Sequence, residues 1–138
     1  MVGSNPVLKI YDEKKKAMEY ELQGEGGLIP GHSMRIYSCK FLEHDPNILL
    51  TGGWDERIII WDLRQENPIR SIYGTYIGGD GIDFADNTIL TASYRDENTL
   101  QLWDFGTTKL KEELPWSKKG GKDAEPCPLY CCKFSKLD

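Results

Sequence analysis

Three residue types that could carry out acyl-transfer chemistry lie close together in the first half of the chain. His32, Thr51 and Asp55 offer a base, a hydroxyl group and a carboxylate, the set that activates a hydroxyl nucleophile in many hydrolases. Such a nucleophile also needs donors that stabilise an oxyanion, and no segment that would supply them is evident. Trp61 follows in the same stretch, and a buried Trp or His needs partners for its polar atoms. The set therefore lacks one essential part of a catalytic site.

Cysteine thiols are the next candidates, because thiolates are common zinc ligands. Cys127, Cys131 and Cys132 have the spacing C-x3-C-C. Adjacent residues of a strand point to opposite faces, and no paired Cys or His cluster completes four ligands, so no metal site is expected. Cys132 aligns with Cys39 in a repeated segment, and both are expected at core-facing strand positions as small buried residues.

Glycine-rich and acidic segments give no specific signal. Residues 24–27 and 78–81 are rich in glycine, but they lack the Lys-Ser/Thr pair and the following helix of a phosphate-binding loop. Asp80, Asp83 and Asp86 are three residues apart, which does not match an EF-hand loop. These segments are expected to be turns, and no cofactor is expected.

Short apolar segments separated by clusters of turn-forming residues predict a series of short β-strands. The segment Pro68–Tyr73 is short and polar enough for an edge strand. The expected strands are Val7–Asp12, Ala17–Gln23, Ile36–Phe41, Ile48–Thr51, Arg57–Trp61, Pro68–Tyr73, Gly81–Phe84, Thr88–Ala92, Leu100–Trp103 and Lys109–Leu114.

Two internal repeats relate these strands to one another. The Trp-Asp pair at 61–62 recurs at 103–104, which is 42 residues later. The segment 37–41, Tyr-Ser-Cys-Lys-Phe, reappears at 130–134 as Tyr-Cys-Cys-Lys-Phe, close to two repeat lengths further on. Residues 130–134 are therefore expected to form the first strand of another repeat.

The stretch from Gly31 to Asp62 begins with Gly-His and ends with Trp-Asp, and these marks resemble the Trp-Asp repeat (WD-repeat) family of β-propeller proteins. One repeat of that family is about 40–45 residues long and forms a four-stranded blade. The resemblance implies an all-β fold, a WD-repeat β-propeller segment with four-stranded antiparallel blades, two of them full and flanked by partial ones. It is strongest over residues 31–62 and weakest over 74–98.

The resemblance divides the chain into four units. Because closure of the ring shields strand edges and needs about four to eight blades, the chain is interpreted as a fragment, with head-to-tail assembly of copies as the alternative. The units are a partial blade (third and fourth strands) with a connecting loop at 1–30, a full blade at 31–73, a second and irregular blade at 74–116, and a loop with the first strand of a further blade at 117–138.

The resemblance also implies a structural tetrad in the full blade. Asp55 would hold His32, and His32 would bond to the hydroxyl of Thr51. Thr51 would in turn accept a hydrogen bond from the indole of Trp61. The resemblance thereby gives His32, Thr51 and Asp55 a structural role within the blade.

The second blade keeps only part of this tetrad. Thr91, Asp96 and Trp103 are its equivalents, but no histidine accompanies them, and residues 76–80 stand where Gly-His is expected. Its network is expected to be incomplete or built differently, and this blade is expected to be the softer one.

In WD-repeat propellers the loops before the first strand and between the second and third strands share one face, which commonly receives partners. Tyr, Trp and Arg are enriched at binding hot spots. Trp54 lies in a Gly-Gly-Trp-Asp turn, where either contact with a partner or packing on a neighbouring loop would account for it. The residues expected on this face are Arg35, Tyr37, Trp54, Asp80, Arg95 and Tyr130.

Composition excludes several classes of function. The 138 residues are 39% hydrophobic, which fits a soluble globular unit, and the net charge of −5 argues against a nucleic-acid partner. No apolar run approaches the roughly 20 residues that span a bilayer, and no secretory signal is visible. Four cysteines without a repeated spacing indicate reduced thiols and a cytoplasmic location.

The predicted function is non-enzymatic: a protein–protein interaction scaffold or adaptor whose partners are other proteins bound at the propeller face. The alternative is a structural subunit of a larger cytoskeletal or ciliary assembly. In that case self-association or a companion chain would complete the open blade edges. No membrane partner is expected.

Overall fold

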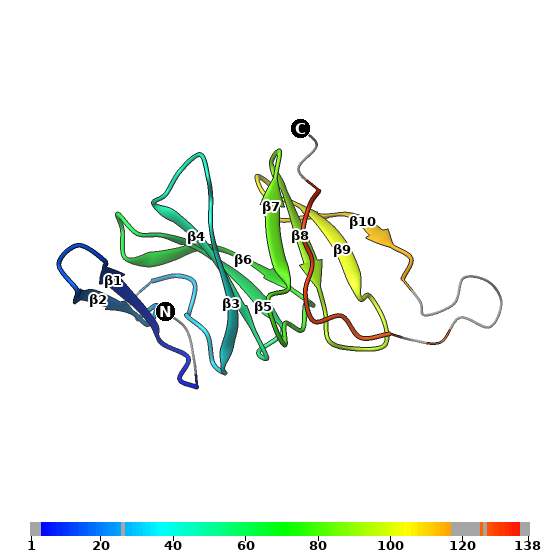
Figure 1. Cartoon of the computed structure of the whole chain (residues 1–138), viewed down its shortest axis with the longest axis horizontal. Coiled ribbons are helices and arrows are strands. Elements are labelled where there is room, and N and C mark those ends of the chain that lie inside the picture. The colour runs from blue at the N-terminus through cyan, green and yellow to red at the C-terminus, as the bar shows by residue number, and fades with distance from the viewer. Residues whose placement is uncertain (1–3, 26, 117–124, 126, 136–138) are drawn as a thin grey trace.

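The structure is a computed structural model that describes residues 4–25, 27–116, 125 and 127–135. This part of the chain contains ten β-strands and no helix, arranged as three antiparallel sheets next to one another (Figure 1). The fold is all-β, and the ten strands expected from the sequence are present with bounds that differ by at most two residues.

Within each sheet the strands are neighbours in chain order. Two strands form the N-terminal hairpin, and two sheets of four strands follow, here named blade 1 and blade 2. The N-terminal hairpin consists of β1 (Leu8–Asp12) and β2 (Ala17–Leu22). Blade 1 consists of β3 (Ile36–Phe41), β4 (Ile48–Gly53), β5 (Arg57–Asp62) and β6 (Asn67–Tyr73). Blade 2 consists of β7 (Ile82–Ala85), β8 (Thr88–Ala92), β9 (Leu100–Asp104) and β10 (Leu110–Leu114).

The central strands of blade 1, β4 and β5, are buried along their whole length. Successive side chains of a strand point to opposite faces, so each of these strands contributes to two cores. Leu49, Ile59 and Trp61 pack against Leu8 and Leu22 of the N-terminal hairpin. Burial on both faces explains why the sequence here is a continuous apolar run and not an alternating one.

The opposite face of blade 1 packs against blade 2. Leu50, Ile58 and Ile60 alternate with the residues that face the hairpin. A third, smaller core joins blade 2 to residues 127–135, named the C-terminal segment. From blade 2 the main core receives Ile82, Ile89 and Trp103, together with Ile77 from the loop before them.

The Asp of each Trp-Asp pair closes the turn that follows its strand. Asp62 accepts a hydrogen bond of 3.0 Å from the backbone N–H of Arg64, and Asp104 accepts one of 2.7 Å from that of Thr107. Asp12, at the end of β1, does the same for the backbone N–H of residue 15 at 2.8 Å. The acidic half of the repeated pair is therefore a turn-forming residue.

The expectation that Cys39 faces the core is wrong. Cys39 is exposed, and Phe41 on the same side of β3 is 48% exposed. The N-terminal hairpin has only two strands, and its core includes residues of β4 and β5 but none of β3. Cys132 is buried as expected, because it packs against blade 2.

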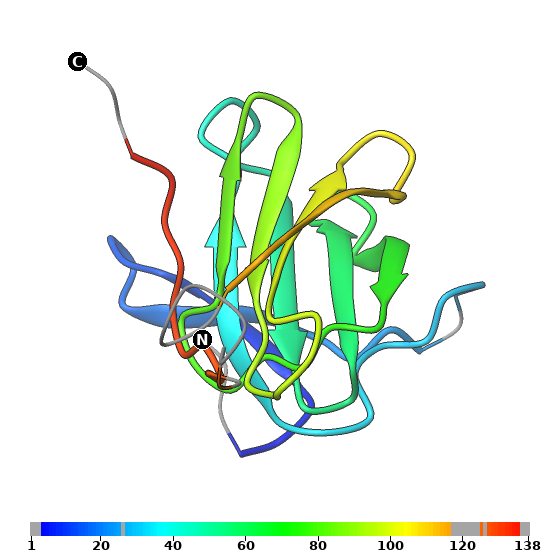
Figure 2. The ribbon, with the colours of Figure 1, turned by 90° about the vertical axis from the view of Figure 1, so that its right-hand side faces the viewer.

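The expectation of a strand at 130–134 is also wrong. The described residues 127–135 belong to no sheet, because a strand needs a neighbour with a continuous ladder of backbone hydrogen bonds. The segment makes separate bonds instead, from Leu129 N–H to the Ser93 carbonyl at 3.1 Å and from Cys132 N–H to the Asp80 carbonyl at 3.3 Å. It runs in an extended course beside blade 2 (Figure 2).

The core between the two blades gives a first prediction. Ile60 is 0% exposed, so Ile60→Ala is expected to lower the free energy of unfolding by about 2–5 kcal/mol through lost burial and a residual cavity. Urea-induced unfolding measures the change. Leu110→Ala is the matched control, because Leu110 on β10 is 46% exposed and its truncation is expected to cost less than about 1 kcal/mol. Equal losses in the two variants would contradict the assignment of this core.

Candidate functional site

Four side chains of blade 1 form one chain of hydrogen bonds, named the tetrad. Trp61 Nε1 donates to Thr51 Oγ1 at 2.7 Å, and His32 Nε2 lies 2.7 Å from the same hydroxyl. His32 Nδ1 lies 2.8 Å from Asp55 Oδ2. Because the indole N–H can only donate, the neutral imidazole would accept from the Thr51 hydroxyl and donate to Asp55.

The environment of Asp55 favours its charged form. Burial alone would raise the pKa of this carboxyl, but hydrogen bonds from His32 and from the backbone N–H of Ser33 outweigh burial. The pKa of Asp55 therefore lies below its ordinary value of 3.8. A charged Asp55 in turn fixes the orientation of the His32 ring.

The same geometry argues against Thr51 as a nucleophile. Thr51 and Trp61 are 0% exposed and His32 is 6% exposed, so a substrate has no route to the hydroxyl. Both hydrogen-bonding directions of the hydroxyl are already used inside the blade. The arrangement satisfies buried polar atoms where strands meet a loop.

Blade 2 contains half of this network. Trp103 Nε1 donates to Thr91 Oγ1 at 3.0 Å, and the Thr91 hydroxyl donates to the Gln101 carbonyl at 3.4 Å. Asp96 is exposed and takes part in neither bond. Of the three residues expected there, the structure brings together Thr91 and Trp103 only.

Thr75 takes the place of His32 in blade 2, which corrects the expectation that residues 76–80 stand there. The threonine of each network pairs with a residue of the first strand, Cys39 in blade 1 and Ile82 in blade 2. His32 and Thr75 each lie seven residues before that strand residue. Both positions are buried.

An arginine holds the backbone just before each of these two positions. The Arg57 guanidinium donates to the Gly31 carbonyl at 3.0 Å and to the Pro30 carbonyl at 2.9 Å. In blade 2 the Arg95 guanidinium donates to the Gly74 carbonyl. Gly74-Thr75 is therefore the counterpart of Gly31-His32. The sequence does not reveal this relation, because Arg57 is the first residue of β5 whereas Arg95 lies in the loop before β9.

Two buried polar atoms of blade 2 and its preceding loop are unpaired. Thr75 Oγ1 and Gln101 Oε1 are buried and have no hydrogen-bond partner among the described residues. Each such atom costs about 1–3 kcal/mol relative to a paired one. The network of blade 2 is thus less complete than the tetrad of blade 1.

Aromatic rings gather where the loops of blade 1 meet those of blade 2. The Trp54 ring lies 4.9 Å from Tyr37 and 6.2 Å from Tyr76 between centroids, and Tyr94 lies 4.8 Å from Tyr130. Gly78 separates the two groups, since a Cβ there would lie 3.1 Å from Tyr94 Cβ and 3.9 Å from Trp54 Nε1. The rings together with Arg35 are named the aromatic end: Arg35, Tyr37, Trp54, Tyr76, Tyr94 and Tyr130.

The residues expected on the partner-binding face differ in exposure. Arg35 is exposed, and its guanidinium has no ion-pair partner in the described part of the chain. Tyr130 is 59% exposed. Asp80 is exposed but occupied, because it accepts from the Ser38 hydroxyl at 3.4 Å and lies 3.9 Å from Lys133. Arg95 is half-buried and holds a backbone carbonyl instead of facing solvent.

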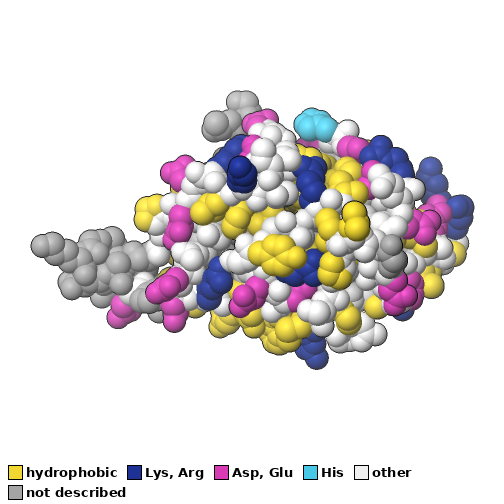
Figure 3. Space-filling model, turned by 180° about the vertical axis from the view of Figure 1, so that it is seen from behind, with side chains coloured by type: hydrophobic (Ala, Val, Ile, Leu, Met, Phe, Trp, Pro, Cys, Tyr) yellow, Lys and Arg dark blue, Asp and Glu magenta, His cyan; other side chains and the backbone are white. Residues whose placement is uncertain are grey.

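Trp54 packs on neighbouring loops, which was one of the two alternatives that the sequence left open. Its ring is half-buried between Tyr37 and Tyr76, and its Nε1 is buried with no partner among the described residues. Tyr76 and Tyr94, the latter 45% exposed, were missed. Both stand in the loops already assigned to this face, so their positions alone would have suggested them. Apolar side chains gather along the lower edge of the molecule in Figure 3.

Comparison with known proteins identifies the repeat. A family model described as "WD domain, G-beta repeat" matches residues 25–62, the part of the chain that contains the whole tetrad. The small ribosomal subunit protein RACK1 of Neurospora crassa is 32% identical over 88 residues, which are 59% of this chain and 27% of that protein. Residues 25–62 of this chain therefore match the WD repeat, and the chain is similar to WD-repeat proteins.

Two further relatives extend the comparison. Histone acetyltransferase type B subunit 2 of Debaryomyces hansenii is 30% identical over 100 residues, 60% of this chain and 24% of that protein. Autophagy-related protein 16 of Arabidopsis thaliana is 29% identical over 96 residues, 67% of this chain and 17% of that protein. The chain thus spans about a quarter or less of the length of these curated relatives. WD-repeat proteins generally act as interaction scaffolds that bind other proteins.

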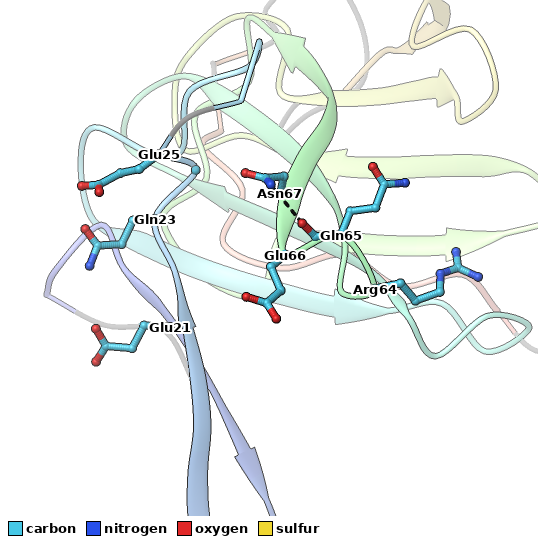
Figure 4. A pocket seen from close by; sticks show the side chains of 8 residues that line it. Glu21, Gln23, Glu25, Arg64, Gln65, Glu66 and Asn67 are labelled. Carbon is cyan, nitrogen blue, oxygen red and sulfur yellow. Dashed lines mark hydrogen bonds between the residues drawn. The ribbon is translucent and has the colours of Figure 1, made fainter.

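A polar groove of about 410 Å³ lies between the end of β2 and the β5–β6 turn of this chain. Glu21, Gln23, Gly24 and Glu25 line one side, and residues 64–67 line the other (Figure 4). Three of the lining side chains are carboxylates, of which Glu21 is paired with Lys9 at 2.9 Å. An acidic lining by itself identifies no ligand.

The cysteines of the C-terminal segment do not converge. The Cys132 thiol lies 3.7 Å from the Leu90 carbonyl, and burial raises its pKa to about 12, whereas Cys131 is exposed. No group of three or more His, Cys, Asp or Glu among the described residues could hold a metal ion. The described residues also include no helix that could cross a membrane.

The difference between the two networks gives a second prediction. Thr51→Val leaves both His32 Nε2 and Trp61 Nε1 buried without a partner, so it is expected to lower the free energy of unfolding by about 2–4 kcal/mol. Thr91→Val is the matched control, since it leaves Trp103 Nε1 unpaired and otherwise removes only the long bond of 3.4 Å to the Gln101 carbonyl, and it is expected to cost about 1–2 kcal/mol. Urea-induced unfolding of both variants measures the difference. A larger loss in Thr91→Val would show that the tetrad is not the stronger network.

The lowered pKa of Asp55 gives a third prediction. A carboxyl whose pKa is lower in the folded than in the unfolded state stabilises the fold above its unfolded pKa, and this contribution is lost as the pH falls through the folded value. The free energy of unfolding should therefore decrease as the pH is lowered from about 4. Over this range of pH the Asp55→Asn variant should lose less stability than the wild type. Unfolding free energies at pH 2.5–7 check this. Parallel pH curves for the two proteins would contradict it.

Proposed function

We propose that this chain is a non-enzymatic scaffold that binds other proteins through the aromatic end. The observation that carries the proposal is the exposed Arg35 without an ion-pair partner among the described residues, on the loop that leads into the aromatic rings. The backbone N–H of Trp54 donates to the Arg35 carbonyl at 3.2 Å, so the backbone of Arg35 is held next to Trp54. A partner would meet a cation beside apolar rings.

The composition of this surface supports a protein partner. Tyr, Trp and Arg are the residues most enriched at binding hot spots, because they combine large contact area with few rotatable bonds or with a rigid donor fork. Tyr94 and Tyr130 keep about half of their area in solvent, so contact can still bury them. The rings are held by packing between two blades, which limits the entropy lost on binding.

A non-enzymatic role agrees with the buried state of the only Thr-His-Asp set that the sequence offered. The proposal includes no cofactor, no nucleic acid and no membrane partner, and it places the protein in the cytoplasm. A structural role in a larger assembly is the second candidate. The half-buried leucines of β9 favour it, because they leave one side of blade 2 incompletely covered.

The proposal gives a fourth prediction, tested by charge reversal and ring truncation. The double variant Arg35→Glu/Tyr130→Ala is expected to weaken partner binding at least about tenfold while the thermal unfolding midpoint stays unchanged, because both side chains are exposed. Proteins that the wild-type chain retains from a cell extract are identified first. Their dissociation constants are then measured with the purified chains by calorimetry.

Lys14→Glu is the matched control, since it reverses an exposed charge in the β1–β2 turn, remote from the aromatic end in sequence. It should bind like the wild type. Partners that bind the double variant and the wild type equally would show that the interaction surface lies elsewhere on the chain.

A further inference from the structure

The loop between β2 and β3 presents a leucine that the described part of the chain leaves uncovered. Leu28 is fully exposed, at 105%, whereas the next most exposed large hydrophobic side chain among the described residues, Tyr73, is at 65%. A single exposed apolar residue is common on protein surfaces, so Leu28 is informative only through the structure that holds it and the charges around it. The loop is named the leucine loop and consists of the described residues 24–25 and 27–31.

The two ends of the leucine loop are held against each other. A Cβ at Gly24 would lie 2.7 Å from Gly31 Cα, and a Cβ at Gly31 would collide with the Gln23 carbonyl, so the close contact requires glycine. The Arg57 guanidinium donates to the carbonyls of Pro30 and Gly31 at 2.9 and 3.0 Å. The loop therefore has a fixed base, as compact loops with close ends do, and it projects beyond the sheets on the side opposite the C-terminal segment (Figure 2).

The surroundings of the leucine loop are acidic. Glu25 of the loop lines one side of the polar groove, and a Cβ at Gly27 would lie 3.4 Å from Asn67 Oδ1 on the other side. Glu25 and Glu66 are exposed and have no ion-pair partner among the described residues. Arg64 of the same lining is already paired with a carboxylate at the end of β5 at 2.8 Å, so it does not neutralise them. The loop thus combines an apolar tip with two uncompensated negative charges beside it.

We propose that the leucine loop is a second interaction surface, for a partner protein with an apolar pocket rimmed by Lys or Arg side chains. The pocket takes the Leu28 side chain, which gains the full free energy of burial because nothing in the described part of the chain covers it beforehand. The cations of the rim face Glu25 and Glu66, and this complementarity speeds association and disfavours partners with an acidic rim. The base of the loop is already ordered, so binding orders few further groups. The loop shares no residue with the aromatic end, so this proposal can fail while the proposed function stands.

A second copy of this chain is not the expected occupant. A larger groove of this chain, of about 610 Å³, lies between the end of β3 and the β7–β8 turn, and its apolar lining includes Phe84 and Phe134. Three carboxylates and two lysines share this lining, and Lys40 is already paired with Asp83 at 2.7 Å. The groove therefore presents no surplus of positive charge to the acidic leucine loop. The carboxylates of the loop also disfavour an anionic lipid surface, which attracts basic segments.

Photo-crosslinking in an extract of the cells that produce the chain tests the proposal. The probe is the full chain with p-benzoylphenylalanine in place of Leu28, and the matched control carries it in place of Leu110, which is 46% exposed on β10. At least one protein should be crosslinked from position 28 and not from position 110. That protein, once purified, should bind Leu28→Ser at least about tenfold more weakly than the wild type, and Leu110→Ser within about twofold of it. The thermal unfolding midpoint of Leu28→Ser should stay unchanged, because the side chain is exposed.

Charge reversal tests the expected basic rim of the partner. Glu25→Lys/Glu66→Lys should weaken binding of the same purified protein at least about tenfold. Glu13→Lys/Glu112→Lys is the matched control, because both of its positions are exposed and lie outside the loop and its groove, and it should bind like the wild type. Affinity should also fall as the salt concentration rises from about 0.05 to 0.5 M.

Four results would overturn the proposal. The first is that no protein is crosslinked specifically from position 28. The second is a crosslinked protein whose affinity survives Leu28→Ser or the reversal of Glu25 and Glu66. The third is a loss of affinity in Arg35→Glu/Tyr130→Ala alone, which would support the aromatic end instead. The fourth is binding to phosphatidylserine vesicles that Leu28→Ser removes, which would show that the loop contacts a lipid surface.

Discussion

Burial of β4 and β5 on both faces is the constraint on which the rest of the structure depends. All twelve residues of these strands are buried, so blade 1 needs apolar cover on two sides. The N-terminal hairpin supplies one side and blade 2 the other. Each sheet is stable because of its neighbours, as in repeat proteins whose units cannot bury their apolar faces alone. Exposure increases where a neighbour is partial, at Phe41 and at Leu100 and Leu102 of β9.

The tetrad follows from the same constraint. Trp61 fills the core against the hairpin, and its indole N–H must then find an acceptor inside the protein. Thr51 supplies that acceptor, and His32 extends the chain of hydrogen bonds to the carboxylate of Asp55, whose side chain is only 2% exposed. In blade 2 Thr91 alone accepts the indole N–H, from Trp103. The buried hydroxyl of Thr75 is left without a hydrogen-bond partner among the described residues. The set that looked most like catalytic machinery is thus a consequence of packing.

The proposed partner contact lies at the ends of the strands. The sheets fix the loops, and the loops bring Trp54, Tyr76 and Tyr94 from two blades to one end of the molecule. Trp61 and Trp103 within the blades, in contrast, are buried and have no access to a partner. A rigid scaffold with exposed aromatic residues at one end suits recognition of proteins better than chemistry on a small substrate.

The sequence by itself determined the strands, the all-β class and the repeat of Trp-Asp pairs, because these depend on local apolar pattern and turn chemistry. It also placed the four residues of the tetrad in one blade, through their resemblance to a known repeat. Only the tertiary structure decided that Cys132 is buried and Cys39 is exposed. The two cysteines stand in similar local sequences, but different segments pack against them. It also showed that Thr75 replaces His32, because strand register and not sequence order relates the two blades. Burial and pairing depend on contacts between distant segments, and a local pattern carries no record of them.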